Sequence, residues 1–290
     1  MRQKQIFFLF LLYFIFFSCT NNTPSTTKKN LINNNNDSLI KEQESHVEKI
    51  YFNVPSTMRT AYILKKAGAN YDASLPLDPS IATEDFISDQ QALILGILGS
   101  DLNYTIVSNK NQETVFYLNS INVLGEKLGL GNVLNQEMKN RIESNINSKD
   151  SMQVLVTDLF WHVEKSLNED GRSSTSALII AGGWIEGLYI ATQIAKKMPE
   201  NEKIKSIICQ QKFSSKSVLE LIKNITYSDY ISESIVLPLE EINRSLSTIK
   251  TEKEFSDSDL NVDNNNIIVD NAVIKDVCSI IEQIREDITH

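Results

Sequence analysis

Apolar residues recur at three- and four-residue intervals along most of the chain beyond residue 46. This spacing is typical of amphipathic helices, because 3.6 residues complete one helical turn. Period-two alternation, which would indicate strands, is confined to brief runs such as Ile267–Val269. The pattern therefore predicts an all-α protein, a multi-helix bundle with no substantial sheet.

Polar residues, glycines and prolines set the expected ends of the helices. Gly68 is placed to end the first helix, Thr83 to start the next, and the stretch Asn70–Pro79 between them should be an irregular loop. Pro238 should kink or divide the helix that it interrupts. Expected N-caps are Asn111, Ser148 or Asp150, Asn201 and Asp270. The expected helices cover about 54–67, a stretch beginning at 83, 90–107, 112–128, 135–145, 148–167, 174–197, 203–211, 217–223, 228–250 and 270–288.

The helix expected over 174–197 is apolar on every side, with Glu186 as the one charge in its central turns. A helix without a polar face is typical of a protein core. Gly183 and Gly187, four residues apart, leave a strip without side chains along which a neighbouring backbone can approach. We expect the bundle to pack around this buried central helix.

Glu186 is the leading candidate for a functional residue, because small and apolar residues flank it on the expected helix. Such a desolvated carboxylate could have a raised pKa or bind a cation at the floor of a pocket, with Asp101 of another helix as a second acid. The structural alternative, which we favour, is an acceptor bonded to a Lys, Arg, Tyr or helix end. Trp184 and Tyr189 are expected to be core aromatics rather than a ligand cage.

Histidine content limits the chemistry of the folded region. Of three histidines, His46 borders the linker and His290 ends the chain, so that His162 alone lies within the body. A two-histidine metal site is therefore excluded, and we expect no metal and no cofactor. Asp158, four residues before His162, could orient it as a base or form half of a metal site, although a plain surface contact is the commoner arrangement. The chain has no GxGxxG, GxSxG or HExxH segment.

The first residues predict export. The basic start MRQKQ precedes an apolar run from Ile6 to Phe17, which is too short to span a membrane and indicates a signal peptide over residues 1–18. Ser18 and Cys19 resemble the end of a bacterial lipobox, although Phe16 and Phe17 stand where Leu and a small residue are usual. We expect Cys19 to carry lipid. No Asp follows it, so the expected location is the outer membrane, facing the periplasm.

Residues 19–45 are polar and rich in Asn and Thr, which predicts a lipidated, disordered linker, and residues 46–290 are expected to form a single helical domain. The 28 basic and 37 acidic residues give a net charge of −9, which argues against nucleic-acid binding. Cys209 and Cys278 form an even pair that could make a disulfide in an oxidising compartment. The alternative is two buried thiols that act as small apolar groups.

Three segments carry a resemblance to a known family: NVPSTMRTAYILKKAGANYDASL, LGILGSDLNYTIV and GGWIEGLYIAT. Together they resemble an uncharacterised family of exported, all-helical bacterial lipoproteins, over about Phe52 to Lys223. The chain departs from that pattern at Thr57, where Pro is expected, and at Ile97–Gly99, where a Tyr before Gly is expected. The resemblance implies a helical fold and no particular activity.

These features together predict a lipid-anchored periplasmic helical protein with a structural or binding role. Its expected partners are the membrane, through the lipid, and an envelope protein or a small ligand held between helices. The alternative is an enzyme or sensor with a carboxylate-lined pocket for a small molecule or cation around Glu186.

Overall fold

The computed structural model of the chain describes residues 54, 56–133, 135–250 and 267–290. All of them belong to one compact unit, Ser45–His290. The predicted signal peptide, the lipidation site Cys19 and the linker before residue 46 lie outside the described residues.

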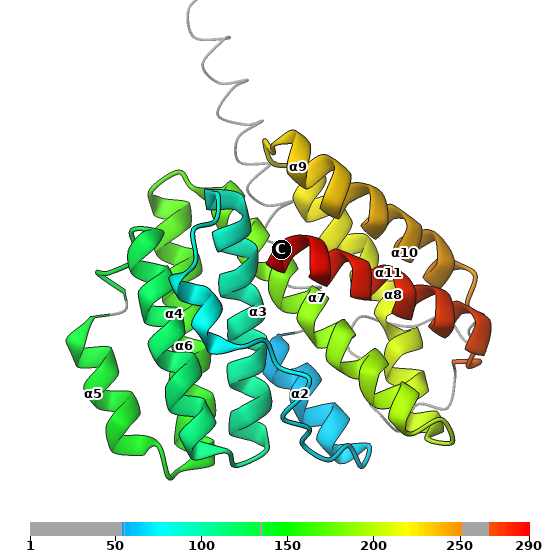
Figure 1. Cartoon of the computed structure of the whole chain (residues 1–290), viewed down its shortest axis with the longest axis horizontal. Helices are drawn as coiled ribbons and strands as arrows, with labels where there is room; N and C mark the ends of the chain where they lie inside the picture. Colours follow the sequence, from blue (N-terminus) through cyan, green and yellow to red (C-terminus); the bar gives the residue numbers. More distant parts are fainter. Residues whose placement is uncertain (1–53, 55, 134, 251–266) are drawn as a thin grey trace, which may run out of the picture. The chain divides into compact units, whose positions relative to one another are not determined.

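The described residues form helices and no strand, which confirms the all-α prediction (Figure 1). A 3₁₀ helix at Pro79–Thr83 and a π-helical turn at Ser232–Val236 supplement the α-helices. The α-helices are α2 (Thr57–Lys66), α3 (Ser88–Val107), α4 (Asn111–Lys127), α5 (Gln136–Asn145), α6 (Lys149–Glu169), α7 (Ser173–Lys197), α8 (Glu202–Lys223), α9 (Asp229–Ile231), α10 (Leu237–Ser247) and α11 (Asn271–Thr289).

Several predicted helix ends are confirmed by their capping geometry. Ser148, Asn201 and Asp270 each accept a hydrogen bond from a backbone N–H in the first turn of the helix that follows. Gly68, just beyond α2, has a φ of +95°, a backbone conformation that favours glycine at a helix end. Asn111 as a cap is wrong, since it is the first residue of α4 and makes no capping bond.

Helix α7 is the central helix of the bundle, as predicted (Figure 1). It packs against α2, α3, α6, α8 and α11, and the helix is buried along most of its length. Among the described helices it is the one long and apolar enough to cross a membrane by length and composition. Because 83% of its apolar window is buried inside the protein, it serves here as a core helix.

The contact between α3 and α7 is made by backbone against backbone at two glycines. A Cβ atom added to Gly96 would lie 1.9 Å from the carbonyl oxygen of Ile179, and one added to Gly182 would lie 2.0 Å from that of Leu93. The close approach predicted for α7 is therefore present, but it centres on Gly182. Gly183 and Gly187 face threonine side chains of α2.

The helix start predicted at Thr83 is wrong. Thr83 instead ends the 3₁₀ helix that begins at Pro79, where Asp78 caps the turn by accepting a hydrogen bond from the Ser80 N–H. Proline suits this first position, because its missing N–H is not needed there. Helix α3 then begins at Ser88.

The two short helices predicted over 203–211 and 217–223 are one continuous helix, α8. The serines between them are helical, and their hydroxyls bond to the preceding turn: Ser214 Oγ donates to the Gln211 carbonyl and Ser215 Oγ to the Lys212 carbonyl. Burial against the core then stabilises the joined segment.

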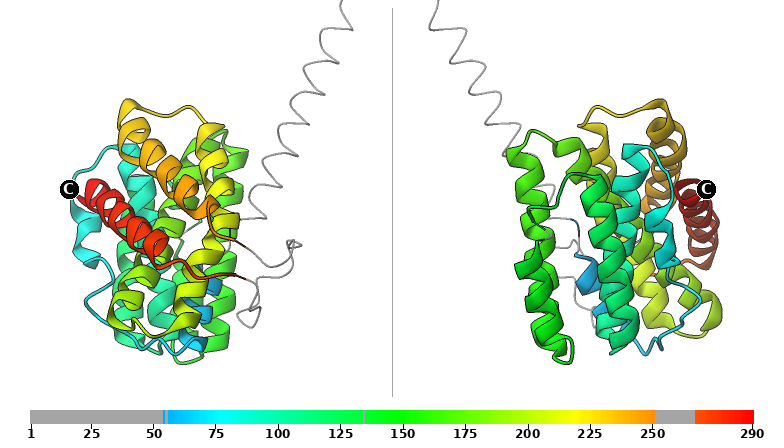
Figure 2. Two further views of the ribbon diagram at one scale, coloured as in Figure 1. Left: turned by 90° about the vertical axis from the view of Figure 1, so that its right-hand side faces the viewer. Right: turned by 60° about the vertical axis from the view of Figure 1, so that its left-hand side comes forward.

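Pro238 interrupts its helix in the manner predicted. The π-helical turn Ser232–Val236 precedes it, and Pro238 then occupies the first turn of α10. The i→i+5 bonding of the turn thus lies directly before the proline, which has no N–H to donate. Helix α10 packs beside α11, and α11 also lies on α7 (Figure 2).

Candidate functional site

Glu186 lies in the middle of α7 and is fully buried. Its partner is Arg285 of α11, which donates from Nε to Oε2 at 2.7 Å and from Nη2 to Oε1 at 3.2 Å. The planar guanidinium thus engages both carboxylate oxygens, the geometry that makes arginine suited to buried ion pairs. Of the two alternatives for Glu186, the structure shows the structural one, in which the carboxylate accepts hydrogen bonds from an arginine.

Asp101 of α3 lies beside this ion pair and is also fully buried. Its Oδ2 accepts a hydrogen bond from the Leu77 N–H at 3.0 Å, whereas Oδ1 accepts none. The Asp101 and Glu186 carboxyl groups are within hydrogen-bond reach of each other. A protonated Asp101 would donate to Glu186 and leave no orphaned oxygen.

Burial and the neighbouring Glu186 carboxylate raise the pKa of Asp101 well above its usual value. Burial also raises the pKa of Glu186, but the Arg285 guanidinium and the hydrogen bond from Asp101 both oppose that rise. Of the two acids, Asp101 is therefore the one whose pKa is raised well above its usual value, while the Arg285 guanidinium favours the charged form of Glu186.

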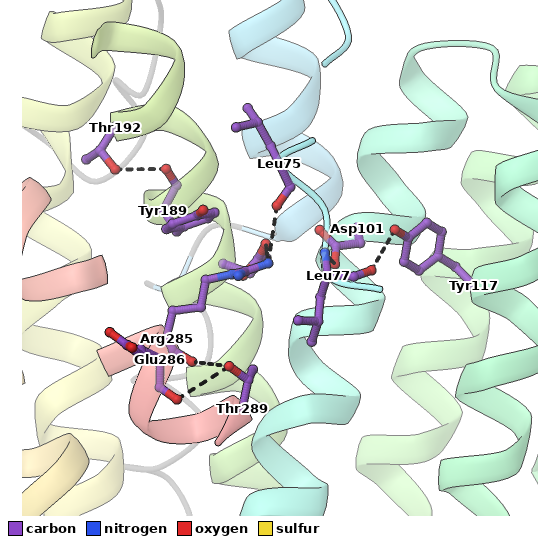
Figure 3. Close-up of polar contacts among 10 residues, drawn as sticks. Leu75, Leu77, Asp101, Tyr117, Tyr189, Thr192, Arg285, Glu286 and Thr289 are labelled. Atoms are coloured by element: carbon purple, nitrogen blue, oxygen red, sulfur yellow. Dashed lines mark hydrogen bonds and ion pairs between the residues drawn. The ribbon is translucent and has the colours of Figure 1, made fainter. Parts of the chain in front are cut away.

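The loop after α2 lies across this cluster and takes part in it (Figure 3). The Leu75 carbonyl accepts a hydrogen bond from Arg285 Nη2 at 3.2 Å, and the Leu77 carbonyl accepts one from the Tyr117 hydroxyl at 2.8 Å. The Arg285 guanidinium also stacks on the Tyr189 ring, 4.2 Å from its centroid. Loop backbone and aromatic rings therefore occupy the positions where a ligand could contact the charged groups.

The other predicted residues do not join the Glu186 cluster. Trp184 is buried on another side of α7, where its Nε1 donates to Ser214 Oγ at 2.9 Å and to Gln211 Oε1 at 3.1 Å. Asp158 and His162 lie on α6, where His162 Nδ1 is 2.7 Å from the Asp158 backbone oxygen rather than from its carboxylate. Of the predicted set, the structure brings together Glu186, Asp101 and Tyr189.

Cys209 and Cys278 are both buried and both free thiols. Burial raises the pKa of the Cys209 thiol, which keeps it protonated and unreactive. Among the described residues, no group of three or more His, Cys, Asp or Glu side chains is placed to hold a metal ion.

The main cavities of the described residues lie away from Glu186. One of about 330 Å³ lies beside His162 between α5 and α6, and a wide one of about 670 Å³ lies at the Pro199 turn. A third, of about 270 Å³, lies between α2, α3, α6 and α7. Neither Glu186 nor Asp101 lines any of these three.

Sequence reasoning missed Arg285, although it named arginine among the partner types for Glu186. A signal was present: Arg285 lies four residues after Ile281 and three before Ile288, on the apolar side of its helix. A single charge at such a position needs a buried partner. The sequence does not show which of the distant carboxylates it meets.

Comparison with known proteins gave no match to a family model. No curated protein and no solved structure was found to be similar to the chain.

Proposed function

We propose that this chain is a lipid-anchored protein of the bacterial cell envelope, held at the outer membrane and facing the periplasm, with a structural or binding role. The anchor follows from the signal-peptide pattern and the position of Cys19. The binding or structural role rests on one observation. The best candidate for a catalytic acid, Glu186, already has Arg285 on both of its oxygens.

The chemistry of that cluster supports a role without turnover. A general acid or base must reach the proton that it transfers, within about 3 Å of a bound substrate. Glu186 and Asp101 are both 0% exposed. The Leu75–Leu77 loop lies on the remaining side of the cluster, where the Leu75 carbonyl accepts a hydrogen bond from Arg285 and the Leu77 N–H donates one to Asp101. The two carboxyls therefore join α3, α7 and α11 to this loop.

The anchor is tested by moving the cysteine. In the bacterium of origin, the full chain should fractionate with membranes and incorporate labelled fatty acid, whereas Cys19→Ser should do neither. The variant that combines Cys19→Ser with Ser38→Cys keeps the number of cysteines and changes only the position. It should behave like Cys19→Ser. Unchanged membrane fractionation and labelling of Cys19→Ser would overturn the anchor.

The alternative is an enzyme or sensor that uses the paired carboxylates, and one observation favours it. Two adjacent acids, one with a raised pKa, are the arrangement that many hydrolytic sites use. It predicts that the purified chain turns over an ester, phosphate or glycoside substrate. It also predicts that Glu186→Gln and Asp101→Asn each abolish the activity while the protein stays folded. If both variants stay folded and lose turnover, the cluster of Glu186 and Asp101 is catalytic rather than structural.

A further inference from the structure

The cavity of about 270 Å³ between α2, α3, α6 and α7 has a mainly apolar wall. Phe160 and Trp161 of α6 supply aromatic rings, and Ile180 of α7 supplies an aliphatic side. The Trp161 side chain is 55% exposed, so it lies at the open edge of the cavity. The volume suits a ligand of about ten heavy atoms, below the usual size of a drug-like site.

Three polar side chains in this wall have an acceptor oxygen that accepts no hydrogen bond from the described residues. Ser176 of α7 is only 2% exposed, and its hydroxyl makes no hydrogen bond within the described part of the chain. Asn103 of α3 is 3% exposed; its Nδ2 donates to Thr57 Oγ1 at 2.6 Å, while its Oδ1 accepts nothing. Buried polar groups are normally paired, so the unpaired Asn103 Oδ1 in the wall of this cavity indicates a ligand.

Glu164 of α6 is the third group and the one charge in the wall. It is half-buried, and no Lys, Arg or His among the described residues forms an ion pair with it. Burial raises the pKa of its carboxyl group, as expected for an acid that has lost water without gaining a cation. A carboxylate, an amide oxygen and a hydroxyl all accept hydrogen bonds, so their common complement is a donor with positive charge.

We propose that this cavity binds a small primary ammonium compound with an apolar body. The ammonium group donates to the Glu164 carboxylate, and its other N–H groups have Asn103 Oδ1 and Ser176 Oγ as acceptors. The apolar body lies against Phe160, Trp161 and Ile180. The proposal rests on the binding role proposed above, but it is independent of the lipid anchor.

The test uses the full chain purified in detergent and three probes of nearly equal size: phenethylammonium, the neutral 2-phenylethanol and the anionic phenylacetate. Calorimetry measures binding, and detergent alone corrects for partitioning into micelles. The chain has two tryptophans, of which Trp184 is buried and Trp161 is exposed. A change in the fluorescence of the exposed tryptophan therefore locates the probe at Trp161. We expect phenethylammonium to bind at least about tenfold more tightly than the alcohol, and the anion to bind least.

Variants assign the contacts. Glu164→Gln should weaken phenethylammonium binding at least about tenfold and remove the preference over the alcohol. Ser176→Ala should weaken it about threefold and leave folding intact, because the hydroxyl has no partner to lose among the described residues. Glu143→Gln, an exposed position on α5, removes the same charge and should change binding less than twofold.

Two results would overturn the proposal: no phenethylammonium binding at millimolar concentration, or equal binding by wild type and Glu164→Gln. Tighter binding of 2-phenylethanol than of the ammonium probe would overturn the ligand class while keeping a binding role. The anchor proposal stands or falls separately, through the fractionation of Cys19→Ser.

Discussion

The ion pair between Glu186 and Arg285 is the residue-scale feature that holds distant parts of the chain together. Both charges are largely removed from water, with the Arg285 side chain only 14% exposed. A buried pair of this kind adds little net stability compared with apolar groups, but losing one partner strands the other charge. We infer that its main effect is to specify how α11 lies on α7.

Loss of the arginine should be more damaging than loss of the carboxylate. Arg285→Leu should lower the free energy of unfolding by about 3–5 kcal/mol at pH 7, because it leaves Glu186 charged and buried. Glu186→Gln should lower it by about 1–3 kcal/mol, since its amide oxygen still accepts a hydrogen bond from Arg285. Urea unfolding followed by circular dichroism measures both.

Arg244→Leu is the matched control, because Arg244 is exposed on α10 and should change stability by less than about 0.5 kcal/mol. If Arg285→Leu were no worse than Arg244→Leu, the ion pair would not be formed in solution.

The raised pKa of Asp101 gives a pH dependence of definite sign. Folded Asp101 stays protonated above the pH at which the unfolded chain releases that proton, so the folded state binds more protons. Stability contributed by this group is therefore present at low pH and falls as the pH rises above about 4, by up to about 1.4 kcal/mol per pH unit. The loss continues until the pH passes the folded pKa.

Asp101→Asn should remove this slope, because an amide can donate to Glu186 and accept from Leu77 as the protonated acid does. The variant should equal wild type near pH 4 and become the more stable of the two as the pH rises to 8. Urea midpoints across this range provide the measurement. A wild type that gains stability relative to Asp101→Asn with rising pH would mean that Asp101 is ionised in the folded state.

At the scale of elements, the glycines explain why α3 and α7 can lie so close. Neither Gly96 nor Gly182 has room for a methyl group, since the atoms that it would meet are backbone and cannot rotate away. The sequence indicates close packing, because glycine in a helix costs about 1 kcal/mol relative to alanine and needs a compensating reason. It does not reveal which glycine meets which helix.

Gly96→Ala should therefore destabilise the protein by about 3 kcal/mol or more, the upper end of overpacking effects. Gly131→Ala is the control: a Cβ there meets nothing within 4 Å, and its φ is not in the left-handed region. That change should be neutral or stabilise by up to about 1 kcal/mol. Equal thermal midpoints for the two variants would contradict the close contact between α3 and α7.

At the scale of the whole molecule, the free thiols of Cys209 and Cys278 imply that no covalent bridge holds α8 to α11. A reducing agent should leave the urea midpoint of the purified protein unchanged. A disulfide closing so long a loop would contribute about 4 kcal/mol in the chain-entropy model. A clear fall in the midpoint on reduction would show that the bridge forms in solution.

The sequence by itself determined the helical class, the central place of α7 and the special position of Glu186. Apolar period, capping residues and a lone charge in an apolar helix are local features, and local physics decides them. Two predicted helix ends were wrong. At Thr83 the expected helix start is the end of a 3₁₀ turn that begins at Pro79, and in the middle of α8 the expected break is continuous helix with buried serines.

Only the tertiary structure decided what Glu186 does. Arg285 lies 99 residues after Glu186 in the chain. The Leu75–Leu77 loop, which contacts Arg285, precedes α3 in the sequence, whereas Glu186 follows it. Many distant residues could satisfy a buried carboxylate, and packing geometry selects among them. The same holds for Asn103, Glu164 and Ser176, ordinary residues on three helices that gain a shared role only where those helices meet.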